Sequence, residues 1–126
     1  MDITNPVIQT IIMGTQAEYA KKYTEACAFY QQAWELSKDA YEFCIAAHYI
    51  ARCQKSAKER LHWNQIALDQ ANSILHDARI APFLPSLYLN MGQSLAEMGN
   101  FEQSDVYFQK AAALGFPHLE SKPGEF

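Results

Sequence analysis

The chain has 126 residues, of which 49% are hydrophobic, with only 5 glycines and 5 prolines. A chain of this length builds one modest core, and this composition favours packed helices over disorder, so we expect a single domain. The formal net charge of −4 is spread along the chain and creates no basic surface, so we expect no DNA or RNA partner.

The N-terminal segment has no basic residue before Lys21 and therefore lacks the positive region of a secretory signal. Its longest strongly apolar stretch, residues 7–13, is far too short to span a bilayer. The three cysteines, Cys27, Cys44 and Cys53, are odd in number and contain no C-x2-C pair, a pattern more typical of reduced thiols than of a disulfide framework. We expect a cytoplasmic protein with no membrane association.

Start and stop signals predict the first three helices. Asn5 followed by Pro6 is typical of an N-cap and a first helical residue, and this pair predicts a helix that continues to about Ala20. A second helix is expected over residues 24–37. A third is expected over residues 39–53.

The fourth helix begins at a capping box, in which Ser56 is followed three residues later by Glu59. Its apolar residues keep helical spacing to about Ala78, which predicts a long helix. Residues 75–84 are therefore expected to extend this helix and then to form a short linker. The fifth helix is expected within residues 86–98.

The sixth helix is predicted by Asn100 and by Gln103 three residues later, a second capping pattern. It should end at Leu114, with Gly115 in the C′ position. We expect residues 118–126 to form a flexible tail.

The stretch from residue 84 to residue 117 follows a known helix-packing template. The positions that carry it are Tyr88, Met91, Gly92, Leu95, Gly99, Phe101, Phe108, Ala111 and Pro117. This arrangement resembles a tetratricopeptide (TPR) repeat, with its pattern W-x2-L-G-x2-Y, then A-x3-F, then P. The chain departs from that pattern at Ser104, where the family usually has alanine.

Two earlier copies of the template can be aligned. The first copy is carried by small and aromatic residues: Met13, Gly14, Ala17, Tyr23, Ala26, Tyr30 and Ala33. The middle copy keeps small residues 34 positions further along: Ala47, Ala51 and Ala67. It departs from the family at His48, Arg60 and Asn64, which stand where glycine, alanine and an aromatic residue are usual.

The resemblance implies an all-α, TPR-like right-handed solenoid of three helical hairpins, with about six helices. It implies one helical domain over residues 1–117, with repeats at about residues 7–40, 41–74 and 85–117. The chain is also similar to a group of small bacterial TPR proteins of undefined biochemical role.

In a TPR array the first helix of each repeat lines a concave groove. The resemblance therefore implies a partner-binding groove lined by Thr15, Tyr19, Tyr49, Arg52, Asn90, Gln93 and Glu97. Amides that donate and accept beside aromatic rings suit an extended peptide or a partner helix. The alternative interpretation is that most of these residues pack between neighbouring helices.

The positions at which some TPR co-chaperones clamp a terminal carboxylate hold no basic residue here: Ile11, Thr15, Ala46, Ser86 and Asn90. We therefore expect a ligand of neutral or mixed character. A basic cluster does occur within residues 52–60, and it suits either a solvated turn, the commoner case, or an anion at a helix N-terminus.

Motifs that would position a nucleophile, a phosphate or a metal are missing from the sequence. The histidines and cysteines show no metal-ligand spacing, and we interpret His48 as a satisfied imidazole and Cys44 as a buried thiol. We expect no enzymatic activity, no metal and no cofactor.

The ends of a solenoid need a polar outer face or a capping helix, and the sequence shows neither. We expect apolar surface to remain uncovered at five candidate self-association residues: Ile8, Ile11, Ile12, Tyr107 and Phe108. Such patches mark interfaces, so we expect a homodimer that pairs terminal repeats. A monomer and a fragment of a longer array are the alternatives.

The expected function is that of a non-catalytic protein or peptide interaction module. Two alternatives come from other classes, since TPR arrays serve many unrelated partners. One is a structural unit for self-assembly, and the other is a sensor or accessory subunit of an enzyme.

Overall fold

A computed structural model describes residues 2–115 of the chain. Six α-helices occur in this part, together with one short 3₁₀ helix and no strand: α1 (Pro6–Tyr19), α2 (Tyr23–Leu36), α3 (Ala40–Ala51), α4 (Ala57–Asn72), η1 (Ala81–Phe83), α5 (Leu84–Glu97) and α6 (Phe101–Ala113). The prediction of an all-α fold is confirmed for these residues. The expected tail, residues 118–126, lies outside the described part.

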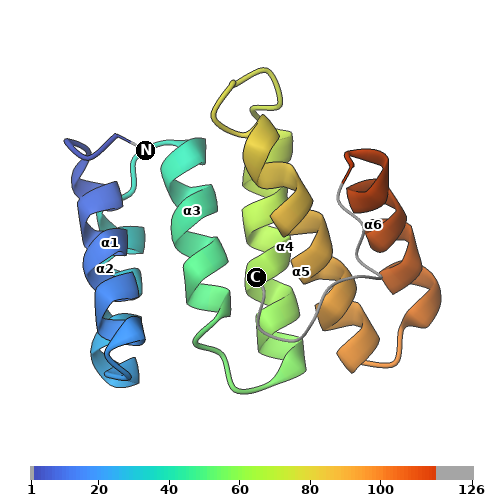
Figure 1. Cartoon of the computed structure of the whole chain (residues 1–126), viewed down its shortest axis with the longest axis horizontal. Helices are drawn as coiled ribbons and strands as arrows, with labels where there is room; N and C mark the ends of the chain where they lie inside the picture. The colour runs from blue at the N-terminus through green and yellow to red at the C-terminus, as the bar shows by residue number, and fades with distance from the viewer. Residues whose placement is uncertain (1, 116–126) are drawn as a thin grey trace.

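Consecutive helices pack in pairs, α1 with α2, α3 with α4, and α5 with α6. Between the pairs, α2 packs on α3 and α4 packs on α5, and α1 also contacts α3. Figure 1 shows the pairs in a row, from α1 and α2 at one end to α6 at the other. The right-handed TPR-like superhelix remains a prediction. No helix in the described part is long and apolar enough to cross a membrane.

Side-chain caps, two of them predicted, explain where three of the helices begin. Asn5 Oδ1 accepts hydrogen bonds from the backbone N–H groups of Val7, at 2.8 Å, and Ile8. Asp39 caps α3 in the same manner. Ser56 caps α4 by accepting from a backbone N–H three residues later. Each side-chain oxygen satisfies a donor that the first helical turn leaves unpaired, which confirms these three predicted starts.

The cap predicted at Asn100 is wrong, although α6 does begin at the next residue. The Asn100 side chain makes no capping bond, and its backbone N–H donates instead to the carbonyl oxygen of Leu95 at 2.9 Å. At the other end of α6, Gly115 has a φ of +84°. That left-handed conformation confirms the predicted C′ glycine.

Helix α4 ends at Asn72, so the prediction that it continues to about Ala78 is wrong. Ser73 Oγ donates to the backbone oxygen of Gln70 at 2.6 Å, and residues 73–80 form turns. These turns return the chain to the core, where Ile80 is fully buried. Burial of one large aliphatic side chain contributes about 1.5–3 kcal/mol, which a longer exposed helix would not provide.

Two glycines allow close contacts within the helix pairs. Gly14 of α1 lies against the ring of Tyr30, and Gly92 of α5 lies against the ring of Phe108. A Cβ atom on Gly92 would lie only 2.6 Å from Phe108 Cε1. These glycines let an aromatic ring of the second helix contact the backbone of the first.

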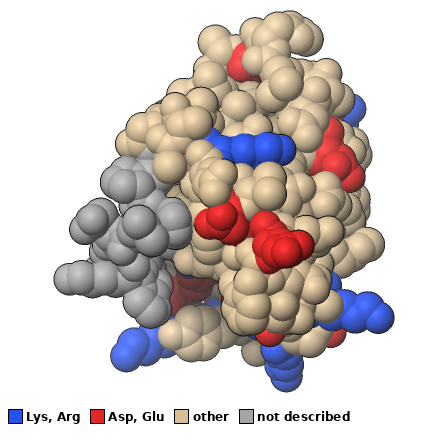
Figure 2. Space-filling view, turned by 90° about the vertical axis from the view of Figure 1, so that its right-hand side faces the viewer, with Lys and Arg blue, Asp and Glu red and all other residues tan. Residues whose placement is uncertain are grey.

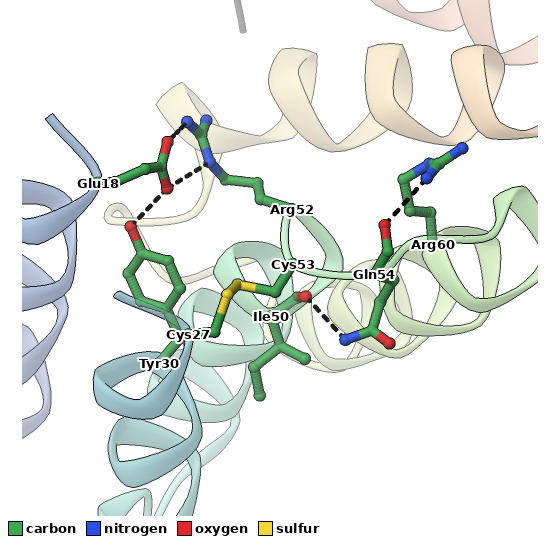
Figure 3. Close-up of a disulfide and its surroundings, with 8 residues drawn as sticks. All are labelled: Glu18, Cys27, Tyr30, Ile50, Arg52, Cys53, Gln54 and Arg60. Carbon is green, nitrogen blue, oxygen red and sulfur yellow. Dashed lines mark hydrogen bonds and ion pairs between the residues drawn. A yellow bond between two sulfur atoms is a disulfide. The ribbon is translucent and has the colours of Figure 1, made fainter. Parts of the chain in front are cut away.

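Cys27 and Cys53 form a disulfide, with their Cα atoms 5.9 Å apart. The prediction of three reduced thiols is therefore wrong, and the expected cytoplasmic location loses the support it drew from them. The bond joins α2 to the turn after α3, as Figure 3 shows. Cys44 is a free, buried thiol, as predicted, and burial raises its pKa to about 12.

Exposed apolar surface coincides only in part with the predicted residues. Ile8 and Ile11 are only 0% and 1% exposed, so the expectation that they leave uncovered surface is wrong. They point into the core between α1 and its neighbours. Ile12 is half-buried against this core.

At the other end of the molecule, Tyr107 and Phe108 are half-buried. Phe101 and Val106 of α6 are 70% and 51% exposed instead. Figure 2 looks onto this end and shows mostly uncharged side chains, with charged ones scattered among them. Apolar surface is thus available on α6, most of it at Phe101 and Val106 and less of it at the predicted Tyr107 and Phe108.

Candidate functional site

An open cavity of about 740 Å³ lies where the ends of several helices converge. It receives side chains from α1, α2, α3, α4 and α5, and from the turn between α3 and α4. All three hairpins therefore contribute to one site. Its size is within the range of pockets that hold a small molecule or a few residues of a peptide.

Part of the predicted groove lines this cavity. Arg52 lies at the end of α3, and Asn90, Gln93 and Glu97 lie on successive turns of α5. The helical spacing of three and four residues places the α5 side chains on one face. The structure thus brings these four predicted residues together.

Thr15, Tyr19 and Tyr49, the other predicted groove residues, are not among those that line the cavity. Thr15 Oγ1 donates to the backbone of α1, and Tyr19 is fully solvated. Tyr49 is half-buried, with its ring 5.1 Å from that of Tyr30. The packing interpretation therefore describes Tyr49 better than the groove interpretation does.

Three polar side chains are buried at the floor of the cavity. His48, Asn64 and Ser94 are only 7%, 6% and 3% exposed, and all three line it. Asn64 Nδ2 donates to Ser94 Oγ at 2.8 Å, and Ser94 Oγ donates to the backbone oxygen of Asn90 at 2.8 Å. Asn90 Nδ2 lies 3.2 Å from His48 Nδ1. We call these four residues the polar floor.

The polar floor was only partly visible in the sequence. The sequence predicts Asn90 for the groove and His48 as a structural residue, and it does not point to Ser94. A signal did exist, because His48, Arg60 and Asn64 are the departures of the middle repeat from the TPR template. All three line the cavity.

His48 is an uncharged ring at neutral pH. Burial, aided by the positive charge of Arg52, lowers its pKa to about 4. Its ring packs edge-on against Tyr49 and Phe83, with centroids 5.0 Å and 4.8 Å away. Since an amide nitrogen can only donate, His48 Nδ1 accepts from Asn90, and the proton of the neutral ring lies on Nε2.

Two ion pairs flank the polar floor. Arg52 pairs with Glu18 of α1, and Tyr30 Oη also donates to Glu18, at 2.9 Å (Figure 3). Burial alone would raise the pKa of Glu18, but the hydrogen bonds from Arg52 and Tyr30 outweigh it and leave that pKa below its ordinary value. On the other side, Arg60 of α4 pairs with Glu97 of α5. The cavity is therefore polar without a strong net charge.

In the described part of the chain, no three His, Cys, Asp or Glu side chains gather where a metal ion could be held. The absence of a metal, a cofactor and enzymatic activity remains a prediction.

A second cavity, of about 610 Å³, is lined by residues of α4, α5 and α6. Leu61, Met91 and Val106 form apolar parts of its wall, and Tyr107 contributes as well. Lys110 lies over the Tyr107 ring, 5.1 Å from its centroid. This surface belongs to the exposed end of the molecule rather than to the predicted groove.

Comparison of the chain with protein-family models, with curated proteins and with solved structures gives no match. The resemblance to TPR repeats therefore rests on the residues quoted above. The class that the fold and the site define is a small all-α protein of three helical hairpins with one polar cavity across them.

Proposed function

We propose that this protein is a non-catalytic interaction module that holds a segment of a partner protein in the polar cavity, on a TPR-like right-handed solenoid. The observation that supports the proposal is the cavity, to which all three hairpins contribute and which contains Arg52, Asn90, Gln93 and Glu97. Its donors and acceptors suit the amide groups of an extended segment.

The charged residues of the cavity limit the net charge of the proposed ligand. Both arginines are already paired with glutamates, Arg52 with Glu18 and Arg60 with Glu97. A strongly anionic segment would have to separate these pairs before it could use the arginines. The proposed partner segment is therefore neutral or mixed in charge, as the sequence predicted.

The proposal is tested by capture of partners from the native organism, followed by titration of the purified partner. Asn90→Ala and Gln93→Ala should each weaken binding by about 1–3 kcal/mol, because a buried partner group loses its hydrogen bond. The matched control is Gln31→Ala, an exposed position on α2 that does not line the cavity. Unchanged affinity in both cavity variants would place the binding site elsewhere.

Self-assembly is a second candidate function, and the exposed apolar residues of α6 favour it. Phe101 and Val106 project from the last described helix of the row. Apolar side chains in such a position are typical of an interface. The two proposals are compatible, because the cavity has no lining residue from α6.

A further inference from the structure

The polar floor has hydrogen-bonding groups that the fold does not use. Among the described residues, none bonds to His48 Nε2, to Asn64 Oδ1 or to Asn90 Oδ1. No fully buried polar side-chain atom in residues 2–115 lacks a partner, so these three atoms are not fully buried, and their side chains line the cavity. One donor and two acceptors therefore face the cavity from side chains that are largely buried.

Hydrogen bonds between hairpins set the arrangement of the residues in the polar floor. Asn90 contacts His48 of α3 through its side chain, while its backbone oxygen accepts from Ser94 and, at 3.4 Å, from Asn64 of α4. Asn90 thus connects His48 and Asn64, and the side chains that carry the unused donor and the two unused acceptors all line one cavity.

The polar floor is a poor binding site for an ion. An anion on the floor would find its donor in the neutral ring of His48, since Arg52 and Arg60 are paired with glutamates. The third cation of the lining, Lys55, is exposed on the turn between α3 and α4. A cation would have to approach Arg52 and the N–H of His48. Burial of an unpaired charge is strongly unfavourable, so the favoured ligand group is uncharged.

The uncharged group must offer an acceptor and a donor on one edge. A primary carboxamide does so, because its oxygen and one N–H are adjacent. A single trans peptide group does not, because its C=O and N–H point in opposite directions. A backbone would need two successive peptide groups to make the same contacts.

We infer that the polar floor binds the side-chain carboxamide of a glutamine or asparagine, with His48 Nε2 donating to its oxygen and Asn64 or Asn90 Oδ1 accepting from its NH₂ group. This inference rests on the proposed function, since it names the side chain by which the partner segment is anchored. It assigns His48 and Asn64 a binding role that the TPR template does not contain.

The experiment uses the full ¹⁵N-labelled chain and reads the His48 ring nitrogens by long-range ¹H–¹⁵N NMR at pH 7. Three capped amino acids with the same backbone serve as probes: N-acetylglutamine, N-acetylglutamate and N-acetylnorvaline N-methylamides. The glutamine probe should shift the Nε2 signal of His48 and the side-chain amide signals of Asn64 and Asn90 in a saturable manner. The other two probes should bind at least tenfold more weakly.

A pair of variants tests the role of Nε2. His48→Gln keeps an N–H group near the Nε2 position and should retain glutamine-probe binding within threefold, read on the Asn64 and Asn90 amides. His48→Leu removes the donor and should reduce the affinity for the glutamine probe at least tenfold. The comparison of the three probes on the unsubstituted protein still tests the inference if either variant fails to fold.

Three outcomes would overturn the inference. Equal responses to all three probes would indicate backbone recognition, and a stronger response to the glutamate probe would indicate an anion site. No response would exclude a carboxamide site. In each case the proposed function is judged separately, by whether Gln93→Ala weakens binding of the captured partner.

Discussion

Asn90 of α5 donates a hydrogen bond of 3.2 Å to Nδ1 of His48 of α3, a residue 42 positions earlier in the chain. The bond joins the second and third hairpins at the floor of the cavity. It requires an unprotonated Nδ1, because a charged imidazole has no acceptor. The protonation state of His48 therefore affects both the stability of the fold and the shape of the site.

The first prediction concerns pH. The native pKa of His48 is lowered to about 4, against 6.5 for the free side chain, so the unfolded chain binds a proton that the native chain does not. Stability attributed to the neutral ring is fully present above pH 6.5 and is lost as the pH falls towards 4. At pH 4.5 the loss should be about 2 to 3 kcal/mol.

Urea denaturation at pH 7.5 and pH 4.5 checks this prediction. Between these pH values the free energy of unfolding should fall more in the unsubstituted protein than in His48→Gln, whose side chain does not titrate. The carboxylates contribute equally to both proteins, so their contribution cancels when the two losses are subtracted. Equal losses would mean that native His48 titrates with an ordinary pKa.

A second prediction concerns the disulfide. Denatured under non-reducing conditions, the chain should expose one reactive thiol, from Cys44, out of its three cysteines. Reduction should lower the free energy of unfolding by about 3 kcal/mol, because the bond closes a loop with a sequence separation of 26. Thiol titration and urea denaturation measure the two quantities.

The control is the double variant Cys27→Ser with Cys53→Ser, whose stability should not respond to a reductant. Three reactive thiols in the unreduced, denatured protein would contradict the disulfide.

Gly92→Ala provides a third prediction, in which two effects oppose each other. Helix propensity alone would stabilise the protein by about 1 kcal/mol. The new Cβ would lie 2.6 Å from Phe108 Cε1, however, and overpacking of this kind costs about 1–3 kcal/mol. We expect net destabilisation in urea denaturation, and Gln103→Ala on the exposed face of α6 should change stability by less than about 0.5 kcal/mol. A more stable Gly92→Ala protein would show that α5 and α6 are less tightly packed.

The fourth prediction concerns self-association, which we expect to produce a homodimer through α6. Val106→Glu should yield monomers, because Val106 is 51% exposed and its replacement does not disturb the core. Phe108 is a poorer choice, since its ring packs on Gly92. Met13→Glu places the same charge on an exposed position of α1 and should leave the dimer intact.

Light scattering coupled to size exclusion over a dilution series measures the oligomeric state. A monomer mass at every concentration would rule out the dimer. Disruption by Met13→Glu alone would move the interface to the first hairpin.

Local signals in the sequence were sufficient for most of the helices. Asn5 and Ser56 cap helices as predicted, and Asp39 caps α3 at its predicted start, because a cap depends on backbone groups only two or three residues away. The end of α4 was misplaced because helical spacing continues beyond Ser73. Turns follow Asn72 instead, and they return Ile80 to the core, where it packs against distant residues.

The sequence by itself thus determined the class of fold, the approximate helices and the polar residues of α5 that face the cavity. Only the tertiary structure decided that Cys27 meets Cys53, that Ile8 lies in the core, and that His48 and Asn64 share one floor. The physical reason is distance along the chain. Periodicity and capping act within a turn of helix, whereas these contacts join residues brought together only when the hairpins pack.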